Sequence, residues 1–421
     1  MRRPAGAEQS MSNLGLLGLG IGAASLSVTW GLYNIFMPLL LRDFVSSSGV
    51  RGAIMGIDNV LGLMFVPLIG ALSDRLDGRL GKRLPFLVVS MPLAAVLFAI
   101  LPFSRASLWT LLAVDIVFLL AMTAFRAPLA ALMPDHVAPA HRPWANAVIT
   151  MLGAVGGALA LVLVAPLADV AIWIPFAVAG TVTLVAVVAV RGASQTHPPF
   201  VATGVIQEDA PLLPGLIRQS ARIFDPRHGP VFYLLTAVFF CFFGYSALEA
   251  QFSTFVTEEF SLSGGRAGLM MGATVVGFVL LALPAGTMVK RLGEVNTMRV
   301  GTTSLAFWLT VGVFVTDPVW LTVILVLGGA SWAFVLVPAY PVVVNQGGAA
   351  EVGFYTGMYY LFGSVAAILA PASVGWAMDQ FGNSALFPVV ASAMALGLLF
   401  LSVAQWTRGR KTTDSDGAGA M

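Results

Sequence analysis

The sequence predicts an all-α membrane protein in which twelve transmembrane helices form two six-helix pseudo-repeats. Three observations support this fold class. The 421 residues are 58% hydrophobic and 10% charged. Apolar segments long enough to span a bilayer alternate with polar loops along the chain, and the two halves align with each other at a nearly constant shift. Together these features place most of the chain in lipid.

The composition excludes an ordinary soluble domain, which carries about 25% charged residues. With so little polar surface, lipid must be the solvent for most of the chain. The net charge of +2 and the absence of a basic patch interleaved with aromatic residues give no indication of nucleic-acid binding. The single cysteine, Cys241, lies in an apolar run and is interpreted as a small buried hydrophobic residue.

The first apolar segment, 14–41, follows Arg2 and Arg3. The apolar region of a signal peptide has about 7–15 residues, so this longer segment is interpreted as the first transmembrane span. Every backbone polar group in hydrocarbon must bond within its own segment, which makes each span a helix. The predicted spans are 14–41, 50–73, 84–103, 107–133, 146–169, 171–190, 230–257, 266–289, 298–316, 318–344, 353–378 and 384–405.

A polar stretch divides these spans into six and six. We therefore expect an N-terminal six-helix bundle over 1–190, a cytoplasmic linker over 191–229, and a C-terminal six-helix bundle with a short cytoplasmic tail over 230–421. If the N-terminus is inside, the segments on that side hold 17 Lys and Arg residues and the opposite loops hold four. Because positively charged loops stay in the cytoplasm, both termini are predicted to be cytoplasmic in a multi-pass protein of the inner membrane.

The halves align at two closely similar shifts. Transporters built from two such units in the same orientation bind substrate between them near mid-membrane. A chance alignment of apolar helices is the alternative. The matches at a shift of 216 are 36–44 with 252–260, Gly52 with Gly268, Gly56 with Gly272, Gly70 with Gly286 and Arg75 with Arg291, and a shift of 210 places Asp135 on Asn345.

The loop after the second span contains Gly70, Ser73-Asp74-Arg75 and Gly81-Lys82-Arg83-Leu84-Pro85-Phe86. It resembles the signature loop of major facilitator transporters, and its ending resembles the glycoside–pentoside–hexuronide branch and its sucrose-transporter-like relatives. Gly70 has no side chain, so a neighbouring helix can approach closely. Asp74 can pair with Arg75 or accept hydrogen bonds from a helix N-terminus, and Gly70, Asp74, Arg75 and Arg83 are assigned a gating role. A basic loop that only sets topology is the alternative.

Charged residues within the spans are functional-site hypotheses, because each costs about 2.5–3.5 kcal/mol at mid-bilayer. Asp58, Asp115 and Glu249, together with Asn34, each lie about 12 Å in from the outer edge at 1.5 Å per residue. Four polar side chains on four helices therefore reach one level. Asp115 is assigned to proton coupling, with a structural pair as the alternative. Asp58 fits either a second titrating site or a sugar-hydroxyl site, and Glu249 is a further coupling candidate.

Arg126 follows Asp115 by eleven residues, which places both on one helix face about 16 Å apart along the axis. This spacing, followed by Ala127, is similar to plant sucrose transporters. The resemblance implies that Asp115 carries the proton and that Arg126 lies in the substrate path. The family has a further Asp close to its Arg-Ala pair, whereas Asp135 here is nine residues past Arg126. A structural partnership of Arg126 with the loop at Asp135 is therefore an open alternative.

Aromatic faces bind sugars, and Trp30, Tyr33 and Trp332 within the spans are candidate substrate contacts, although most membrane aromatics pack or lie at interfaces. No phosphate-binding loop is present, so the chain is not expected to hydrolyse ATP or to be an enzyme. No cofactor or metal is expected, because the four histidines, His136, His141, His197 and His228, fall in predicted loops.

These observations predict alternating-access symport of protons with a sugar, a disaccharide or glycoside, in the lipid bilayer. Three alternatives stay open: a proton-antiport exporter of a drug or metabolite, a sodium-coupled symporter, and a non-transporting assembly factor. Intramembrane carboxylates argue against the last, since an assembly factor does not need them. The sequence names neither the substrate nor the oligomeric state, for which a monomer is the default.

Overall fold

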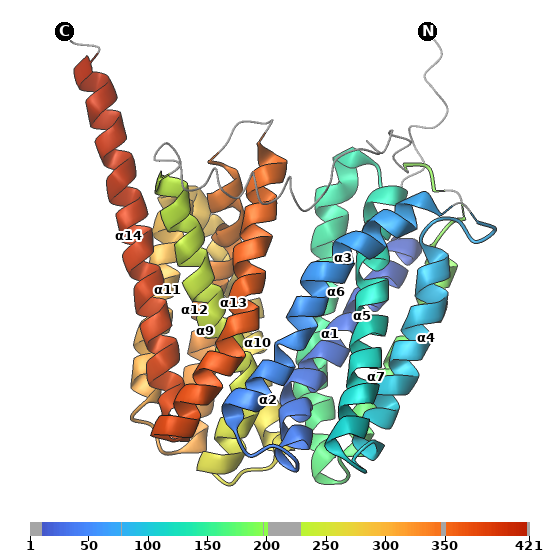
Figure 1. Ribbon diagram of the computed structural model, residues 1–421. Helices are drawn as coiled ribbons and strands as arrows, with labels where there is room; N and C mark the ends of the chain where they lie inside the picture. The colour runs from blue at the N-terminus through green and yellow to red at the C-terminus, as the bar shows by residue number, and fades with distance from the viewer. Residues whose placement is uncertain (1–10, 77, 197, 201–228, 347–350, 419–421) are drawn as a thin grey trace, which may run out of the picture. The chain divides into compact units, whose positions relative to one another are not determined.

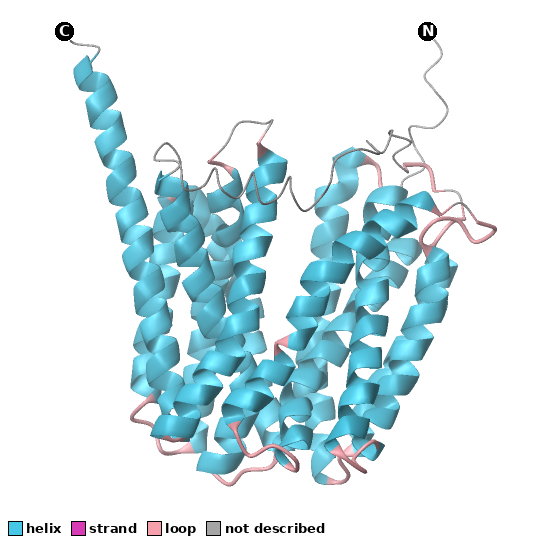
Figure 2. Ribbon diagram, in the orientation of Figure 1, coloured by secondary structure: helices cyan, strands magenta, loops and turns pink. Residues whose placement is uncertain are grey.

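The computed structural model describes residues 11–76, 78–196, 198–200, 229–346 and 351–418. Within these ranges the chain forms helices joined by loops and turns, with no strand (Figures 1 and 2). Eleven helical segments of the described chain are long and apolar enough to cross a membrane. This confirms the predicted all-α membrane fold.

The helices of the first half match the predicted spans, with two local breaks. The second span is divided at Gly56 into α2 and α3, and the fifth continues from α6 into a π-helical turn, Ala160–Val164, and a 3-10 turn, Ala165–Asp169. The bounds are α1 (Asn13–Arg42), α2 (Ser48–Met55), α3 (Ile57–Arg75), α4 (Leu84–Ile100), α5 (Leu108–His136), α6 (Arg142–Leu159) and α7 (Trp173–Ala193).

The second half has the same sequence of long helices. The ninth predicted span corresponds to α11, whose first turns carry Glu294, Asn296 and Arg299 and which is not among the eleven apolar segments. The bounds are α9 (Gly229–Glu259), α10 (Gly264–Leu292), α11 (Glu294–Gly312), α12 (Pro318–Val344), α13 (Val352–Phe381) and α14 (Leu386–Ala418).

Several helices begin where a side-chain oxygen caps free backbone N–H groups. Ser12 accepts from Gly15 N at 3.1 Å at the start of α1, and Ser107 accepts from Thr110 N at 3.2 Å at the start of α5. Asp317 accepts from Val319 N at 2.7 Å at the start of α12. The first N–H groups of a helix have no intrahelical partner, so these caps fix where each helix starts.

The helices pack into two compact units. Unit 1 comprises Met1–Ser46, Ile57–Val205 and Leu262–Gly272, and unit 2 comprises Ser47–Gly56, Ile206–Ser261 and Ala273–Met421. In unit 1, α1 packs against α6 and α7, and α4 packs against α5 and α7. In unit 2, α9 packs against α13 and α14, and α11 packs against α12 and α14. Both units include a short segment from the other half of the sequence.

Large apolar side chains are exposed along the outside of the helices. Val89, Leu283 and Phe314 are 68%, 84% and 79% exposed. Such surfaces are compatible with lipid, which requires internal backbone bonding but tolerates apolar side chains. The predicted cytoplasmic linker, 191–229, lies largely outside the described residues, and its domain limits stay a prediction.

Candidate functional site

A buried carboxylate lies in the core of unit 1. Asp115, midway along α5, is 1% exposed, and its Oδ2 atom accepts a long hydrogen bond of 3.4 Å from the Tyr33 hydroxyl of α1. Its Oδ1 atom is buried and has no hydrogen-bond partner among the described residues. Tyr33 is fully buried and packs against Trp30 and Phe118, with ring centroids 5.5 and 5.7 Å away. Asp115 is therefore held in an apolar pocket with one weak donor.

Asp58 lies in the first turn of α3, close enough to interact electrostatically with both Tyr33 and Asp115. Its Oδ1 atom accepts hydrogen bonds from the backbone N and the side-chain Nδ2 of Asn59, at 2.6 and 2.5 Å. The two predicted carboxylates of the first half thus lie near each other. Asn34, the fourth candidate of this level, is half-buried on α1, next to Tyr33 in sequence.

Arg126 is exposed on α5, whereas Asp115 on the same helix is buried. Its Nη1 atom lies 3.9 Å from the position that a Cβ atom at Gly62 would take, one helical turn beyond Asp58. The alternative role of Arg126, a partnership with Asp135, is not seen: the ion pair of Asp135 is with Arg83, at 3.0 Å. Arg126 therefore presents its guanidinium group near α3.

In unit 2 the candidate aromatic residue belongs to a packed cluster. Trp332 is 5% exposed and stacks on Tyr245, with ring centroids 4.6 Å apart and an interplanar angle of 6°. Phe242 meets Trp332 edge to face at 5.8 Å. Trp332 and Tyr245 border a cavity of about 20 Å³ that Thr274 also lines. Glu249 is half-buried one turn after Tyr245 and interacts with it electrostatically.

The signature loop is organised around Arg83. The Arg83 guanidinium forms an ion pair with Asp74, donates to Asp135 Oδ2 at 3.0 Å, and donates to the Ser73 hydroxyl at 2.5 Å. Of the two arrangements considered for Asp74, the pair with Arg75 is not among the ion pairs of the described residues, since Asp74 pairs with Arg83, which reaches back from the start of α4. Arg83 thus joins the end of α3 to the end of α5.

The close helix approach expected at Gly70 is also absent. A Cβ atom there would lie 3.8 Å from the Cβ atom of Ala127, which is an ordinary contact. The gating roles of the loop residues stay predictions.

The expectation that all four histidines lie in loops is wrong for His136. It ends α5, is 2% exposed, and bonds through Nδ1 to Leu132 O and through Nε2 to Gln195 N, each at 2.8 Å. The α5 helix runs three residues past the predicted span, which carries His136 into the packed core. His197 and His228 lie outside the described residues. Among the described residues no group of three His, Cys, Asp or Glu side chains forms a metal site.

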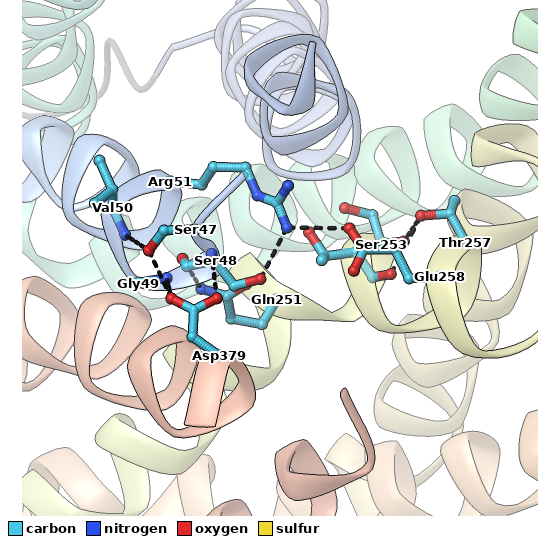
Figure 3. Close-up of polar contacts among 11 residues, drawn as sticks. Ser47, Ser48, Gly49, Val50, Arg51, Gln251, Ser253, Thr257, Glu258 and Asp379 are labelled. Atoms are coloured by element: carbon cyan, nitrogen blue, oxygen red, sulfur yellow. Dashed lines mark hydrogen bonds and ion pairs between the residues drawn. The ribbon is translucent and has the colours of Figure 1, made fainter. Parts of the chain in front are cut away.

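Sequence reasoning missed a polar cluster in unit 2 (Figure 3). Arg51, which the prediction counted among the external loop residues, is 1% exposed and pairs with Glu258 of α9 at 3.1 Å. Asp379 of α13 accepts from Ser47 Oγ, Ser48 N and Gly49 N at 2.6, 2.7 and 3.0 Å. The sequence signals for this region were matches at the shift of 216, among them Gly52 with Gly268 and Gly56 with Gly272, and none of them indicated the ion pair or the carboxylate cap.

Comparison with known proteins agrees with the fold. A family model described as Major Facilitator Superfamily matches residues 19–257 and again 234–420, in accordance with two repeats. No curated protein matches the chain. The nucleoside transporter NupG is similar in structure, with 14% identity, a TM-score of 0.74, and coverage of 93% of this chain and 100% of that one.

Two further solved structures are similar over nearly their whole length. A peptide transporter, POT, has 14% identity and a TM-score of 0.74, with 95% of this chain and 97% of that one covered. A human organic anion transporter has 19% identity and a TM-score of 0.60, with 95% and 100% covered. At such low sequence identities, these similarities show a shared fold and do not extend to the substrate.

Proposed function

Since the chain belongs to the Major Facilitator Superfamily, we propose that it is a secondary active transporter that couples the uptake of a sugar, a disaccharide or glycoside, to protons by alternating access. Membership of this family establishes that the chain is a multi-pass membrane transporter and not an enzyme. The coupling ion and the substrate class are inferred from side chains. The fold itself serves transporters of nucleosides, peptides and organic anions, so it does not choose among substrates.

The observation that carries the proposal is the environment of Asp115. An ionised carboxylate is costly to bury without partners, and this one has a single 3.4 Å donor and an Oδ1 atom without a hydrogen bond. Uptake of a proton removes the charge, and release of the proton needs access to water. Asp115 therefore binds a proton in the state where it is sealed off and releases it when its surroundings open.

Asp58 and Arg126 are the further polar groups that the proposal uses in unit 1. Asp58 interacts electrostatically with Asp115, so a proton on one favours charge on the other. The exposed guanidinium of Arg126 presents several N–H donors in a fixed plane, which suits the oxygen atoms of a polyhydroxylated substrate. Asn34 and Trp30, both half-buried on α1, are the further candidates for substrate contact, with an amide and an indole ring.

The sugar assignment rests on the resemblance of the Gly81–Phe86 segment to the glycoside–pentoside–hexuronide branch and on aromatic residues in the spans. Trp332 stacks on Tyr245 and meets Phe242 in a T-shaped arrangement. Such packing fixes the orientation of the indole ring, and Trp332 is proposed as an aromatic contact of the substrate path on that ground. Trp30 and Tyr33 provide the equivalent aromatic pair in unit 1.

The test is uptake of radiolabelled sucrose and maltose into proteoliposomes with an imposed inward proton gradient. We expect accumulation that collapses with the gradient. In Asp115→Asn, which keeps the size of the side chain but cannot cycle a proton, accumulation should fall at least about tenfold, a smaller effect than the roughly 10²–10⁴-fold that a proton-transfer group contributes in catalysis. Sugar exchange without a gradient should persist. Glu259→Gln, an exposed carboxylate on α9, is the matched control and should behave like the wild type.

Three outcomes would contradict this assignment. Uptake that follows a sodium gradient would identify sodium as the coupling ion. Absence of sucrose and maltose uptake by folded protein would redirect the search to export or to another substrate. Full proton-driven accumulation in an Asp58→Asn, Asp115→Asn double variant would exclude both carboxylates from coupling.

A further inference from the structure

Two helices of the molecule begin against a carboxylate from a distant part of the chain. Asp379 of α13 accepts from the Ser47 hydroxyl and from the N–H groups of Ser48 and Gly49 at the start of α2 (Figure 3). Asp169, after α6, accepts from the Ser263 hydroxyl at 2.9 Å and from Gly265 N at 3.2 Å at the start of α10. Free N–H groups and the helix dipole both favour an anion at these positions.

The two caps are equivalent under the internal repeat. The shift of 216 that aligns the halves places Ser47 on Ser263 and Gly49 on Gly265, and the shift of 210 places Asp169 on Asp379. The donors of the two caps are thus related by the shift of 216, and the carboxylates that accept from them are related by the shift of 210. A chance contact would not recur in this way.

Glycines bring the backbones of the capped helices into direct contact with their neighbours. A Cβ atom at Gly52 of α2 would lie 2.1 Å from Pro371 O of α13, and one at Gly56 would lie 2.9 Å from Ile368 O. The equivalent atom at Gly268 of α10 would lie 2.4 Å from the Cβ atom of Ala165. In the α2 seam, where α2 meets α13, backbone lies against backbone, whereas the α10 seam, where α10 meets residues 160–169, packs through the side chains of Ala165 and Val162. Such close packing favours discrete arrangements over gradual adjustment.

The α2 seam has more polar contacts than the α10 seam. Gln251 of α9 donates to Ser48 O at 3.1 Å and to Pro371 O at 2.7 Å, and Arg51 pairs with Glu258. At the position equivalent to Arg51, α10 has Ala267, which can form no ion pair. The hold on α2 is therefore the stronger of the two.

Each short segment that begins at a cap packs in one unit, while the residues that follow it in the chain belong to the other unit. Ser47–Gly56 belongs to unit 2, although α3 belongs to unit 1, and Leu262–Gly272 belongs to unit 1, although the remainder of α10 belongs to unit 2. A rearrangement of the two units that keeps the caps must bend the chain after Gly56 and Gly272, whereas release of the caps detaches each short segment from the unit in which it packs. Release breaks a few hydrogen bonds at each seam and requires no new bend in α10 or at the break between α2 and α3.

We propose that Asp169 and Asp379 are positioning residues of the transport cycle, each holding one helix start closed, with Asp169 released before Asp379. This inference rests on the chain being an alternating-access transporter and not on the sugar or the coupling ion. By the Lys and Arg distribution, the starts of α2 and α10 face the outside. Neutralising either carboxylate should then favour the conformation in which its seam is open.

The test measures seam opening directly by cysteine labelling. Cys241 is fully buried and is replaced by alanine, and reporter cysteines are placed at Met55 in the α2 seam or Ala267 in the α10 seam, which are 4% and 0% exposed. Labelling by a hydrophilic maleimide is followed in lipid nanodiscs, where both membrane faces are accessible. Substrate is not needed, so failure of the sugar proposal does not affect the readout.

We expect Asp379→Asn to raise the labelling rate of the Met55 reporter, and Asp169→Asn that of the Ala267 reporter, each by about tenfold or more, since charge-assisted hydrogen bonds are lost. In otherwise unmodified protein, the Ala267 reporter should label faster than the Met55 reporter. Asp379→Glu, which retains the charge, should partly restore protection. Asp317→Asn is the matched control, because Asp317 caps its own helix, α12, and should change neither rate.

Unchanged labelling in both asparagine variants, with wild-type thermal stability, would overturn the proposal and leave the caps as purely structural. Equal increases in the Asp317→Asn control would do the same, since they would reflect general loosening. If an asparagine variant fails to fold, Ser47→Ala and Ser263→Ala each remove one donor to the same carboxylate, and an unchanged rate in both would again contradict it.

Discussion

At the residue scale, exposure separates Arg126 from Asp115 although both lie on α5. Arg126 is exposed and has no ion pair among the described residues, so its charge contributes little to folding. We predict that Arg126→Ala leaves the thermal stability unchanged and raises KM for sugar uptake by about tenfold or more, since hydrogen bonds to charged groups contribute about 1.5–3 kcal/mol. Arg126→Lys should recover part of this, because it retains the charge but loses the planar fork.

Uptake kinetics and a melting curve in detergent separate the two effects. A fall in stability with unchanged KM would show that Arg126 supports the fold, which is the alternative left open by the sequence. The same measurements on Arg191→Ala, an exposed basic residue in the last turn of α7, provide a control.

Single residues also show what the sequence can reveal. The depth of Asp58 and Asp115 follows from counting along helices, and the structure places these two side chains in electrostatic range. The burial of Arg51 does not follow from counting, because its partner Glu258 is 207 residues away. Near the end of an apolar span, an arginine in sequence looks like a loop residue. Only the packed partner distinguishes a buried ion pair from a solvated charge.

At the scale of elements, Arg83 joins the ends of three helices, and its side chain is 11% exposed. It pairs with Asp74 of α3 and Asp135 of α5 from its place before α4. We predict that Arg83→Met destabilises unit 1 by about 3 kcal/mol or more, because breaking a buried pair leaves an uncompensated charge on Asp135. The added Asp135→Asn substitution should recover part of the loss. Thermal unfolding of both variants measures this.

Arg75→Met serves as the matched control, since it removes a basic residue from the same loop without breaking an ion pair that the structure contains. If Arg83→Met and Arg75→Met are equally stable, the network does not hold the three helix ends together. If the double variant is more stable than the wild type, the ion pair of Arg83 with Asp135 is retained for reasons other than stability.

Helix positions were predictable because a span needs about 20 apolar residues, and α12 covers the same residues, 318–344, that the sequence predicted. The division of the second span was not, since hydropathy continues through Gly56. The break becomes intelligible only once α2 is seen to pack against α13, where Gly52 and Pro371 are in contact. Hydropathy detects immersion in lipid and is insensitive to which neighbour a helix contacts.

At the scale of the whole molecule, orientation in the membrane depends on the summed charge of many loops. No single loop decides it, but 17 Lys and Arg residues against four predict that both termini are cytoplasmic. The direction in which a proton gradient drives uptake depends on this orientation. We predict that, with Cys241 replaced by alanine, Thr316→Cys is labelled by an impermeant maleimide in right-side-out vesicles and Gly78→Cys is not.

Both sites suit this measurement because they are exposed, and a side chain at Gly78 would meet no atom within 4 Å. Permeabilising the vesicles should make Gly78→Cys reactive, which shows that its protection came from the membrane. The reverse pattern would place the signature loop outside and invert the proposed gate, and with it the side on which α2 and α10 begin. Labelling of both sites in sealed vesicles would indicate mixed insertion, which a bias of this size should prevent.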